Sequence, residues 1–330
     1  MTETIHTRQF WIRSPGQGVV EDRAIAPPGP GEVLVEASWS GISRGTEALV
    51  FNGAVPESQY HAMRAPFQEG SFPGPVKYGY SSVGKVARAP DAPALEGRSV
   101  FCLFPHQDRY VVPVGAVTRL PEGVPEGRAV LGANMETALN VVWDAAVGPG
   151  DRVLVVGGGV VGLLVAWISR GIPGSEVLLV DVDPSRADVV AALGLSFATS
   201  VPAEFDADVV VHASGSPEGA ASALGGAGVE ARVVEASWFG DRTVGLPLGE
   251  AFHARRITLR SSQVGRIPPD RAPRWTHRRR LEKALELLRV EALDRLVTGE
   301  SPFDELPEIL SRLSADPAGA LCHRIRYGPG

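Results

Sequence analysis

The pattern of hydrophobic and polar positions changes character about a third of the way along the chain. Up to residue 120, short runs of alternating or clustered apolar and β-branched residues are separated by turns rich in Pro and Gly, which is typical of β-strands. These runs are residues 32–38, 82–86, 99–104 and 109–113. From residue 126 onwards, short apolar strands alternate with segments of helical spacing. The pattern therefore predicts an α/β protein with a β-rich first part and a later parallel sheet covered by helices.

The later part of the chain is expected to alternate strictly between strands and helices. We predict strands at 153–156, 177–180, 207–212 and 231–236, and helices at 126–146, 161–169, 185–195, 216–224 and 277–288. The final apolar and basic segment, 321–327, reads as a strand that returns to the first domain. The predicted domains are therefore 1–123 together with 290–330, and 124–289.

A glycine motif lies at the first strand-to-helix junction. Gly157, Gly159 and Gly162 follow the strand 153–156, and Asp181 ends the next strand. In such a motif the first glycine permits a tight turn. The second lets a pyrophosphate approach, and the third lets the helix pack on the strand. The spacing therefore predicts a dinucleotide-binding site.

The residues around this motif favour one cofactor over another. Val160 and Val161 open the helix, whose N-terminal amides attract a phosphate. The carboxylate of Asp181 suits the two ribose hydroxyls of NAD and repels the 2′-phosphate of NADP. Arg186 argues for the opposite choice, since its guanidinium could pair with that phosphate. We expect NAD, with NADP as the less favoured cofactor.

Composition and charge exclude several classes of protein. The chain has 330 residues, of which 44% are hydrophobic and 21% charged, and its net charge is −6, so nucleic acid is not an expected partner. We read the basic run 278–280 as a solvated helix face. No apolar run reaches the roughly 20 residues of a membrane span, and no signal segment opens the chain, so we expect no membrane partner and a cytoplasmic location. With only Cys102 and Cys322, neither a disulfide framework nor a thiolate zinc site is expected.

Three further segments carry a resemblance to a known superfamily. They are residues 40–47, 79–84 and 132–137, and with the turn 148–151 and the late glycine motif they resemble the medium-chain dehydrogenase/reductase superfamily. The resemblance covers nearly the whole chain. It implies a GroES-like, β-rich catalytic domain joined to a Rossmann domain with a doubly wound parallel sheet. The amino-acid sequences of these motifs are most similar to those of the subgroup around bacteriochlorophyllide dehydrogenase.

The same resemblance bears on metal binding. In zinc-dependent members, the ligands occupy positions that correspond here to Ser43, Tyr80 with Ser81, and Ala133. None of these residues binds zinc well, and Ala133 has no donor atom. The resemblance therefore implies a zinc-independent branch with no metal site. A hydrogen-bond donor must then stabilise the substrate oxygen in place of the metal.

Candidates for that chemistry lie in or near the three segments: Ser43, Thr46, Lys77, Tyr80, His106 and Glu136. Tyr80 is the first choice as general acid/base, and Lys77 could lower its pKa, although a packing role for Tyr80 has equal weight. Glu136 could relay protons or hold Arg44. His106 could join a proton relay, while a lone loop histidine is more often structural.

The resemblance also implies further cofactor contacts and a partner. Thr137 and Ser237 would face the nicotinamide side, Ser214 the adenosine end, and Gln263 the carboxamide. The long segment 51–72 has the character of a lid over a cleft. An edge strand at 257–259 predicts a homodimer.

Taken together, these features predict an NAD(H)-dependent alcohol dehydrogenase or ketone reductase. Its expected substrate is a small or specialised-metabolite secondary alcohol or carbonyl compound, in a biosynthetic setting. Two alternatives stay open: an enone or quinone reductase of the same superfamily, and a non-catalytic NAD-binding sensor or structural protein.

Overall fold

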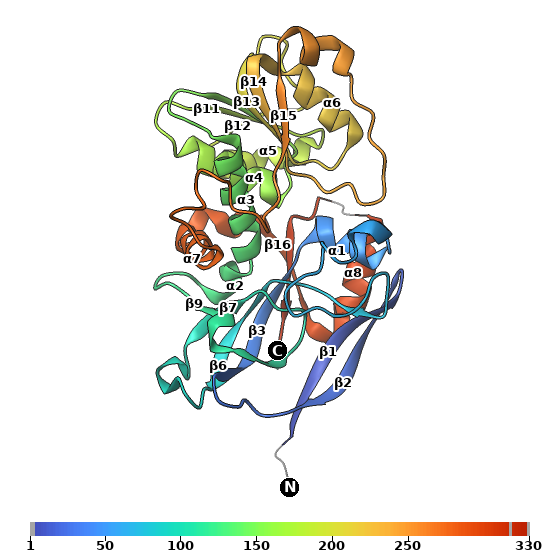
Figure 1. Ribbon diagram of the computed structural model, residues 1–330, viewed down its shortest axis with the longest axis vertical. Coiled ribbons are helices and arrows are strands. Elements are labelled where there is room, and N and C mark those ends of the chain that lie inside the picture. The colour runs from blue at the N-terminus through green and yellow to red at the C-terminus, as the bar shows by residue number, and fades with distance from the viewer. Residues whose placement is uncertain (1–3, 317–318, 329–330) are drawn as a thin grey trace. The chain divides into compact units, whose positions relative to one another are not determined.

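The computed structural model describes residues 4–316 and 319–328, and these fall into two compact units (Figure 1). Unit 1 comprises the described residues of 1–133 and 285–330, and unit 2 comprises residues 134–284. Among the described residues, no helix combines the length and apolar character that a membrane crossing requires.

Unit 1 is built mainly from antiparallel strands. One sheet has the order β2-β1-β5-β4, and the other has the order β16-β17-β3-β6-β7-β9, with β8 paired to β3. The strands are β1 (Ile5–Ser14), β2 (Gln17–Ile25), β3 (Glu32–Ile42), β4 (Glu69–Gly70), β5 (Val76–Lys77), β6 (Ser82–Arg88), β7 (Ser99–Cys102), β8 (Arg109–Pro113), β9 (Val117–Arg119), β16 (Val297–Pro302) and β17 (Cys322–Arg326). Because β17 pairs with β3, the last described strand lies in the same sheet as the first third of the chain.

Helices and β-branched side chains complete unit 1. Val33, Val35 and Val100 are fully buried in its core, as expected for alternating strands with one face inward. The helices are α1 (Arg44–Phe51), α2 (Glu126–Ala129) and α8 (Leu306–Ala315), with the short 3-10 turns η1 (Glu57–Gln59), η2 (Pro93–Leu95), η3 (Val114–Ala116), η6 (Glu291–Leu296) and η7 (Phe303–Glu305).

Unit 2 contains a six-stranded parallel sheet of order β12-β11-β10-β13-β14-β15 (Figure 1). The strands are β10 (Arg152–Val156), β11 (Glu176–Val180), β12 (Ser196–Ala198), β13 (Ala207–His212), β14 (Ala227–Glu235) and β15 (Thr258–Ser261). The helices are α4 (Val160–Arg170), α5 (Ala187–Ala192), α6 (Pro217–Gly225), η4 (Pro184–Arg186) and η5 (Leu248–Phe252), together with most of α3 (Gly132–Ala145) and α7 (His277–Leu287).

The strand order of unit 2 reverses at β10. From β10 the chain passes through α4 to β11 on one side, and later runs from β13 through α6 to β14 on the other side. Right-handed crossovers in opposite directions place helices on both faces of the sheet, and ligands bind at the carboxyl ends of the strands where the order reverses. The predicted fold class, a β-rich part plus a doubly wound parallel sheet, is confirmed.

The predicted helix at 126–146 is wrong in its continuity. The structure breaks it into α2 and α3, separated by residues 130–131. The carbonyl oxygen of Val130 accepts a hydrogen bond from the Ser81 hydroxyl. A tertiary contact with β6 and its preceding loop thus competes with helical spacing at this point.

Candidate active site and dinucleotide site

The glycine turn between β10 and α4 is tightly packed at two of its glycines and open at another. Gly157 has φ +115°, and a Cβ on it would lie 2.5 Å from the backbone nitrogen of Ser214. A Cβ on Gly162 would overlap the carbonyl oxygen of Gly157. A Cβ on Gly159, by contrast, would meet no atom within 4 Å. The turn therefore requires glycine at positions 157 and 162 for its own folding. It leaves free space at Gly159, where a pyrophosphate could approach.

The N-terminus of α4 faces the same turn. Gly159 is its N-cap and provides no side-chain cap, while the half-buried Val160 and Val161 form the first turn of an eleven-residue helix. The first amides of a helix lack intrahelical acceptors, so they present donors and a partial positive charge to an anion.

Asp181 lies directly beside this turn. Its Oδ2 accepts a hydrogen bond from the Gly158 amide at 2.6 Å, and its Oδ1 accepts one from the Asp183 amide at 2.9 Å. A carboxylate offers about four lone-pair sites, so Asp181 keeps acceptor capacity for ribose hydroxyls. Arg186 is buried close by, with its Nε 3.5 Å from Asp183 Oδ2 and its Cγ against Gly158.

The loops after β13 and β14 are cross-linked by side chains that we did not predict from the sequence. His212 Nε2 lies 2.6 Å from Ser214 Oγ, and His212 Nδ1 lies 2.7 Å from Glu235 Oε2. The Gly215 amide donates to Ser237 Oγ at 3.0 Å. Ser214 and Ser237, the two residues of these loops that we predicted to contact the cofactor, thus belong to one hydrogen-bonded network with His212 and Glu235.

A buried arginine organises the region of Glu136, Thr137 and Gln263. Thr137 is half-buried on α3, and its neighbour Glu136 pairs with Arg280 Nε at 3.0 Å. Burial raises the pKa of Glu136, and the charge of Arg280 opposes that rise. Arg280 also donates from Nη2 to the Val264 carbonyl at 2.5 Å, which fixes the loop that carries the exposed Gln263.

This arrangement corrects one interpretation and adds a partner. Arg278 and Arg279 are exposed as expected, but Arg280 is only 2% exposed, so the solvated reading of the basic run is wrong for it. The ion pair of Glu136 is made with Arg280, a partner that we did not predict, while Arg44 donates to the Ala320 carbonyl at 3.3 Å.

In unit 1, Tyr80 forms a polar cluster with the start of α1. The side chains of Ser43 and Thr46 hydrogen-bond to its phenol. Burial raises the pKa of Tyr80 to about 12, and the negative charge of Glu47 adds to that rise. The phenol therefore keeps its proton at neutral pH and can donate a hydrogen bond.

Lys77 does not act on Tyr80 in the way we expected. Its Nζ donates to Gln107 Oε1 at 2.8 Å, pairs with Glu69, and lies 5.1 Å from the centre of the Phe104 ring. Burial lowers the pKa of Lys77. The groups that shift the pKa of Tyr80 do not include Lys77, so the prediction that Lys77 lowers it is wrong.

His106 lies in a buried chain of polar side chains. Its Nε2 is 2.8 Å from Glu47 Oε2, and its Nδ1 is 2.7 Å from Ser40 Oγ, which is itself 2.9 Å from the Tyr327 hydroxyl. The other oxygen of Glu47 accepts from the Ser43 amide at 2.8 Å. These hydrogen bonds connect His106 to the N-terminus of α1.

Glycine makes room for this histidine. Gly79 has φ +131°, and a Cβ on it would lie 2.9 Å from His106 Cδ2. The segment 77–81 therefore holds both Tyr80 and the space that His106 occupies. Glu47, Ser40 and Tyr327 were not predicted, and the only local signal was the glutamate that closes the segment 40–47.

The positions that correspond to zinc ligands in the similar superfamily carry other contacts here. Ser43 and Tyr80 belong to one hydrogen-bonded cluster, and Ser81 donates to the Val130 carbonyl. Within residues 4–316 and 319–328, no group of three or more His, Cys, Asp or Glu side chains is arranged to hold a metal ion. Zinc independence stays a prediction.

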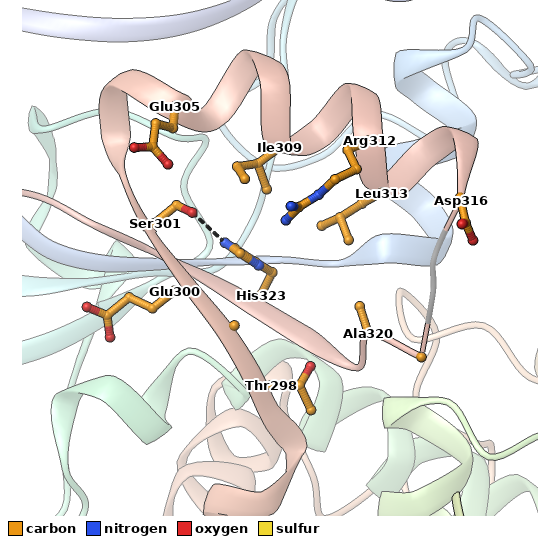
Figure 2. A pocket seen from close by; sticks show the side chains of 12 residues that line it. Thr298, Glu300, Ser301, Glu305, Ile309, Arg312, Leu313, Asp316, Ala320 and His323 are labelled. Carbon is orange, nitrogen blue, oxygen red and sulfur yellow. Dashed lines mark hydrogen bonds between the residues drawn. The ribbon is translucent and has the colours of Figure 1, made fainter. Parts of the chain in front are cut away.

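A separate cavity of about 690 Å³ lies among α8, β16 and β17 in unit 1 (Figure 2). His323 Nε2 is 3.1 Å from Ser301 Oγ there, and burial, together with the charge of Arg312, lowers the pKa of His323. Arg312 and the carboxylates of Glu305 and Asp316 give the cavity charges of both signs. The described residues that line it include none of those predicted as catalytic or cofactor-binding, so we assign the chemistry to the clusters above.

Comparison with known proteins identifies relatives of the chain. No protein-family profile matches the sequence. D-guloside 3-dehydrogenase from Escherichia coli (strain K12) is 27% identical over 296 residues, covering 81% of this chain and 83% of the relative. The 2-desacetyl-2-hydroxyethyl bacteriochlorophyllide A dehydrogenase of Rhodobacter capsulatus is 31% identical over 181 residues, covering 49% of this chain and 52% of that protein. The crystal structure of L-idonate 5-dehydrogenase from Escherichia coli superposes with a TM-score of 0.80 at 17% identity, covering 98% of this chain and 99% of that one.

The fold, the glycine turn and these relatives define the class of the protein. It is an oxidoreductase with a dinucleotide-type unit and a β-rich unit. Its relatives and structural neighbours are members of the medium-chain dehydrogenase/reductase superfamily, which the motifs in its sequence resemble.

Proposed function

We propose that the protein is an NAD(H)-dependent alcohol dehydrogenase or ketone reductase that acts on a secondary alcohol or carbonyl compound without a metal. The observation that carries this proposal is the glycine turn, with open space at Gly159 and the carboxylate of Asp181 beside it. When bound, the nicotinamide ring supplies or accepts the hydride.

The chain offers a full set of residues to hold such a dinucleotide. Gly157, Gly159 and Gly162 form the cradle, and the amides of Val160 and Val161 favour the pyrophosphate. The other proposed contacts are Thr137, Asp181, Arg186, Ser214, Ser237 and Gln263.

Tyr80 is the proposed donor to the substrate oxygen. Its raised pKa, about 12, keeps it neutral, so it stabilises developing negative charge by donation and is a poor base at neutral pH. Ser43 and Thr46 orient the phenol and can pass a proton onward through their hydroxyls.

His106 and Glu136 have supporting parts in this proposal. His106 holds Glu47, and Glu47 accepts from the amide of Ser43, so the pair sets the position of the Ser43 and Thr46 hydroxyls. Glu136 holds Arg280 and through it the loop of Gln263. Lys77 is fully buried and fixes Gln107 next to His106 in the chain.

The preference for NAD rests on the geometry around Asp181. A 2′-phosphate beside that carboxylate would be repelled, whereas ribose hydroxyls would donate to it. Titration of the protein with NADH and NADPH, followed by nicotinamide fluorescence, should give the lower dissociation constant for NADH. A lower constant for NADPH would contradict this choice and point to Arg186 as a phosphate partner.

The substrate class is supported by the relatives. D-guloside 3-dehydrogenase and L-idonate 5-dehydrogenase are named for oxidation at a hydroxyl-bearing carbon. We propose a hydroxyl-bearing small molecule or specialised metabolite as the substrate here.

A substrate panel separates this function from its alternatives. NADH oxidation is measured at 340 nm with a set of ketones and a set of enones and quinones at equal concentration. We expect turnover with ketones. Turnover confined to enones or quinones would assign the alternative reductase activity, and tight NADH binding without any turnover would assign a sensor or structural role.

We also propose that two copies associate through β15. This strand is the edge of the parallel sheet and exposes all four of its side chains, with Leu259 39% exposed. Sedimentation equilibrium should return twice the chain mass, and a monomer mass for the unaltered protein would contradict the proposal.

A further inference from the structure

A histidine and a glutamate side chain lie next to each other at the carboxyl ends of neighbouring parallel strands. His212 ends β13 and Glu235 ends β14, and the two residues are paired in the register of the sheet. The His212 side chain is 1% exposed, and its Nδ1 lies 2.7 Å from Glu235 Oε2. The pair is therefore a largely buried hydrogen bond at the sheet edge where dinucleotides bind in this fold.

Each member of the pair also holds the loop that follows its own strand. His212 Nε2 lies 2.6 Å from Ser214 Oγ, and the second oxygen of Glu235 accepts from the Ser237 amide at 2.8 Å. Ser237 Oγ in turn accepts from the Gly215 amide at 3.0 Å. These contacts form a closed circuit that joins the two loops.

The surroundings are shaped to keep this circuit. A Cβ on Gly219 of α6 would lie 2.8 Å from His212 Nε2 and would overlap Ser214 Oγ. The ring of Phe239 stacks on His212 with centroids 6.0 Å apart. An apolar residue at position 212 would satisfy the packing of β13 without burying a polar ring, so the circuit points to a role in the loops.

We propose that His212 and Glu235 are positioning residues that hold Ser214 and Ser237 as one preorganised surface for the cofactor. We call the pair the His212–Glu235 clamp. The inference rests on the proposed function, since it assumes that the two loops receive NAD(H). Its consequence is that Ser214 and Ser237, which lie in different loops, act together in cofactor binding.

Two substitutions divide the clamp into its halves. The amide of asparagine reaches the position of a histidine Nδ1, and that of glutamine reaches the position of Nε2. His212→Asn therefore keeps the link to Glu235 and loses the link to Ser214, while His212→Gln does the reverse. We expect each to raise the dissociation constant for NADH about tenfold, the loss of roughly one hydrogen bond.

The measurement is a titration with NADH followed by fluorescence, with kcat at saturating NADH as a second readout. A positioning role predicts a raised dissociation constant with kcat changed less than about twofold. His253→Asn, at an exposed histidine of the same unit, is the control and should bind NADH normally. An unchanged dissociation constant in either His212 variant would overturn the clamp, because both links are required.

A double-mutant cycle keeps the inference testable if the His212 variants fail to fold. Ser214→Ala and Ser237→Ala are made singly and together, and the three dissociation constants for NADH are compared with that of the unaltered protein. The clamp predicts that the double variant binds several-fold more tightly than the product of the single effects requires. Independent, multiplicative effects would overturn it.

Failure of the clamp and failure of the proposed function give different results. Normal NADH binding by the unaltered protein, the His212 variants and the serine variants would overturn the clamp alone. An unaltered protein that binds neither NADH nor NADPH would overturn the proposed function and the clamp with it.

Discussion

At the scale of single residues, a raised pKa decides what Tyr80 can do. Its folded-state pKa of about 12 lies above the ordinary value of 10.0, mainly because the phenol is buried. The neutral form is therefore the only populated form through neutral pH, and Tyr80 can stabilise a substrate oxygen as a donor. No titration of Tyr80 should limit activity until the pH approaches 12.

Replacing Tyr80 by phenylalanine removes that donor and keeps the ring. We expect Tyr80→Phe to lower kcat for ketone reduction by about tenfold or more, with NADH affinity unchanged. Tyr60→Phe, at a tyrosine that packs on Phe72, is the matched control and should keep full kcat. Equal turnover for Tyr80→Phe and the unaltered protein would reduce Tyr80 to a packing role.

Arg280 permits a second test at this scale. Arg280→Met leaves the buried Glu136 without its ion-pair partner, and an unpaired buried charge costs about 3 kcal/mol or more. Urea unfolding should show that loss, whereas Arg278→Ala, at an exposed position, should change stability by less than about 0.5 kcal/mol. Similar stabilities for the two variants would contradict the assigned partnership.

At the scale of elements, the turn from β10 to α4 separates glycines needed for folding from one left open for a ligand. Gly157 and Gly162 face backbone atoms at close range, while Gly159 faces open space at the helix N-terminus. The same short motif thus carries two distinct physical requirements.

Alanine substitutions distinguish these requirements. Gly162→Ala should destabilise unit 2 by several kcal/mol, because its Cβ would overlap the Gly157 carbonyl oxygen. Gly159→Ala should keep its unfolding midpoint and lose at least about tenfold in NADH affinity. Both quantities are measured on each variant, by urea unfolding and by NADH fluorescence. Normal NADH binding by Gly159→Ala would mean that the pyrophosphate lies elsewhere.

The elements also show how far the sequence pattern reaches. The apolar strands of unit 2 were predicted closely, with 207–212 matching β13, because a buried parallel strand is a continuous apolar run. Residues 130–131 break the predicted helix, because a tertiary hydrogen bond from Ser81 competes with local spacing. The side-chain pairs of the site could not be predicted from the sequence pattern. Glu47 and His106 are 59 positions apart, and Glu136 and Arg280 are 144 positions apart.

At the scale of the whole molecule, the fold class could be predicted from short sequence motifs that resemble a known superfamily. The residue limits of the two domains stay a proposal. We predicted 1–123 with 290–330, and 124–289, while the compact units are 1–133 with 285–330, and 134–284. Where the chain passes from one unit to the other, short segments such as α2 have little hydrophobic pattern. The sequence alone therefore does not show to which unit they belong.

Buried acids in unit 1 make the stability of the molecule sensitive to alkali. Burial raises the pKa values of Cys102 and Cys322 from 9.0 to about 12, and raises that of Tyr110 well above 10.0. The unfolded chain releases these protons first, so the stability is fully present below pH 9 and is lost as the pH rises towards 12. Urea midpoints should fall steadily above about pH 9. A flat midpoint up to about pH 11 would contradict the burial of these groups.

The most direct test of the central claim measures hydride transfer and metal content on the same sample. The protein is treated with a chelator, its zinc is quantified, and NADH formation from NAD and a panel of secondary alcohols is followed at 340 nm. We expect turnover with at least one alcohol at far less than one zinc per chain. Turnover that disappears with the metal and returns with one zinc per chain would contradict it.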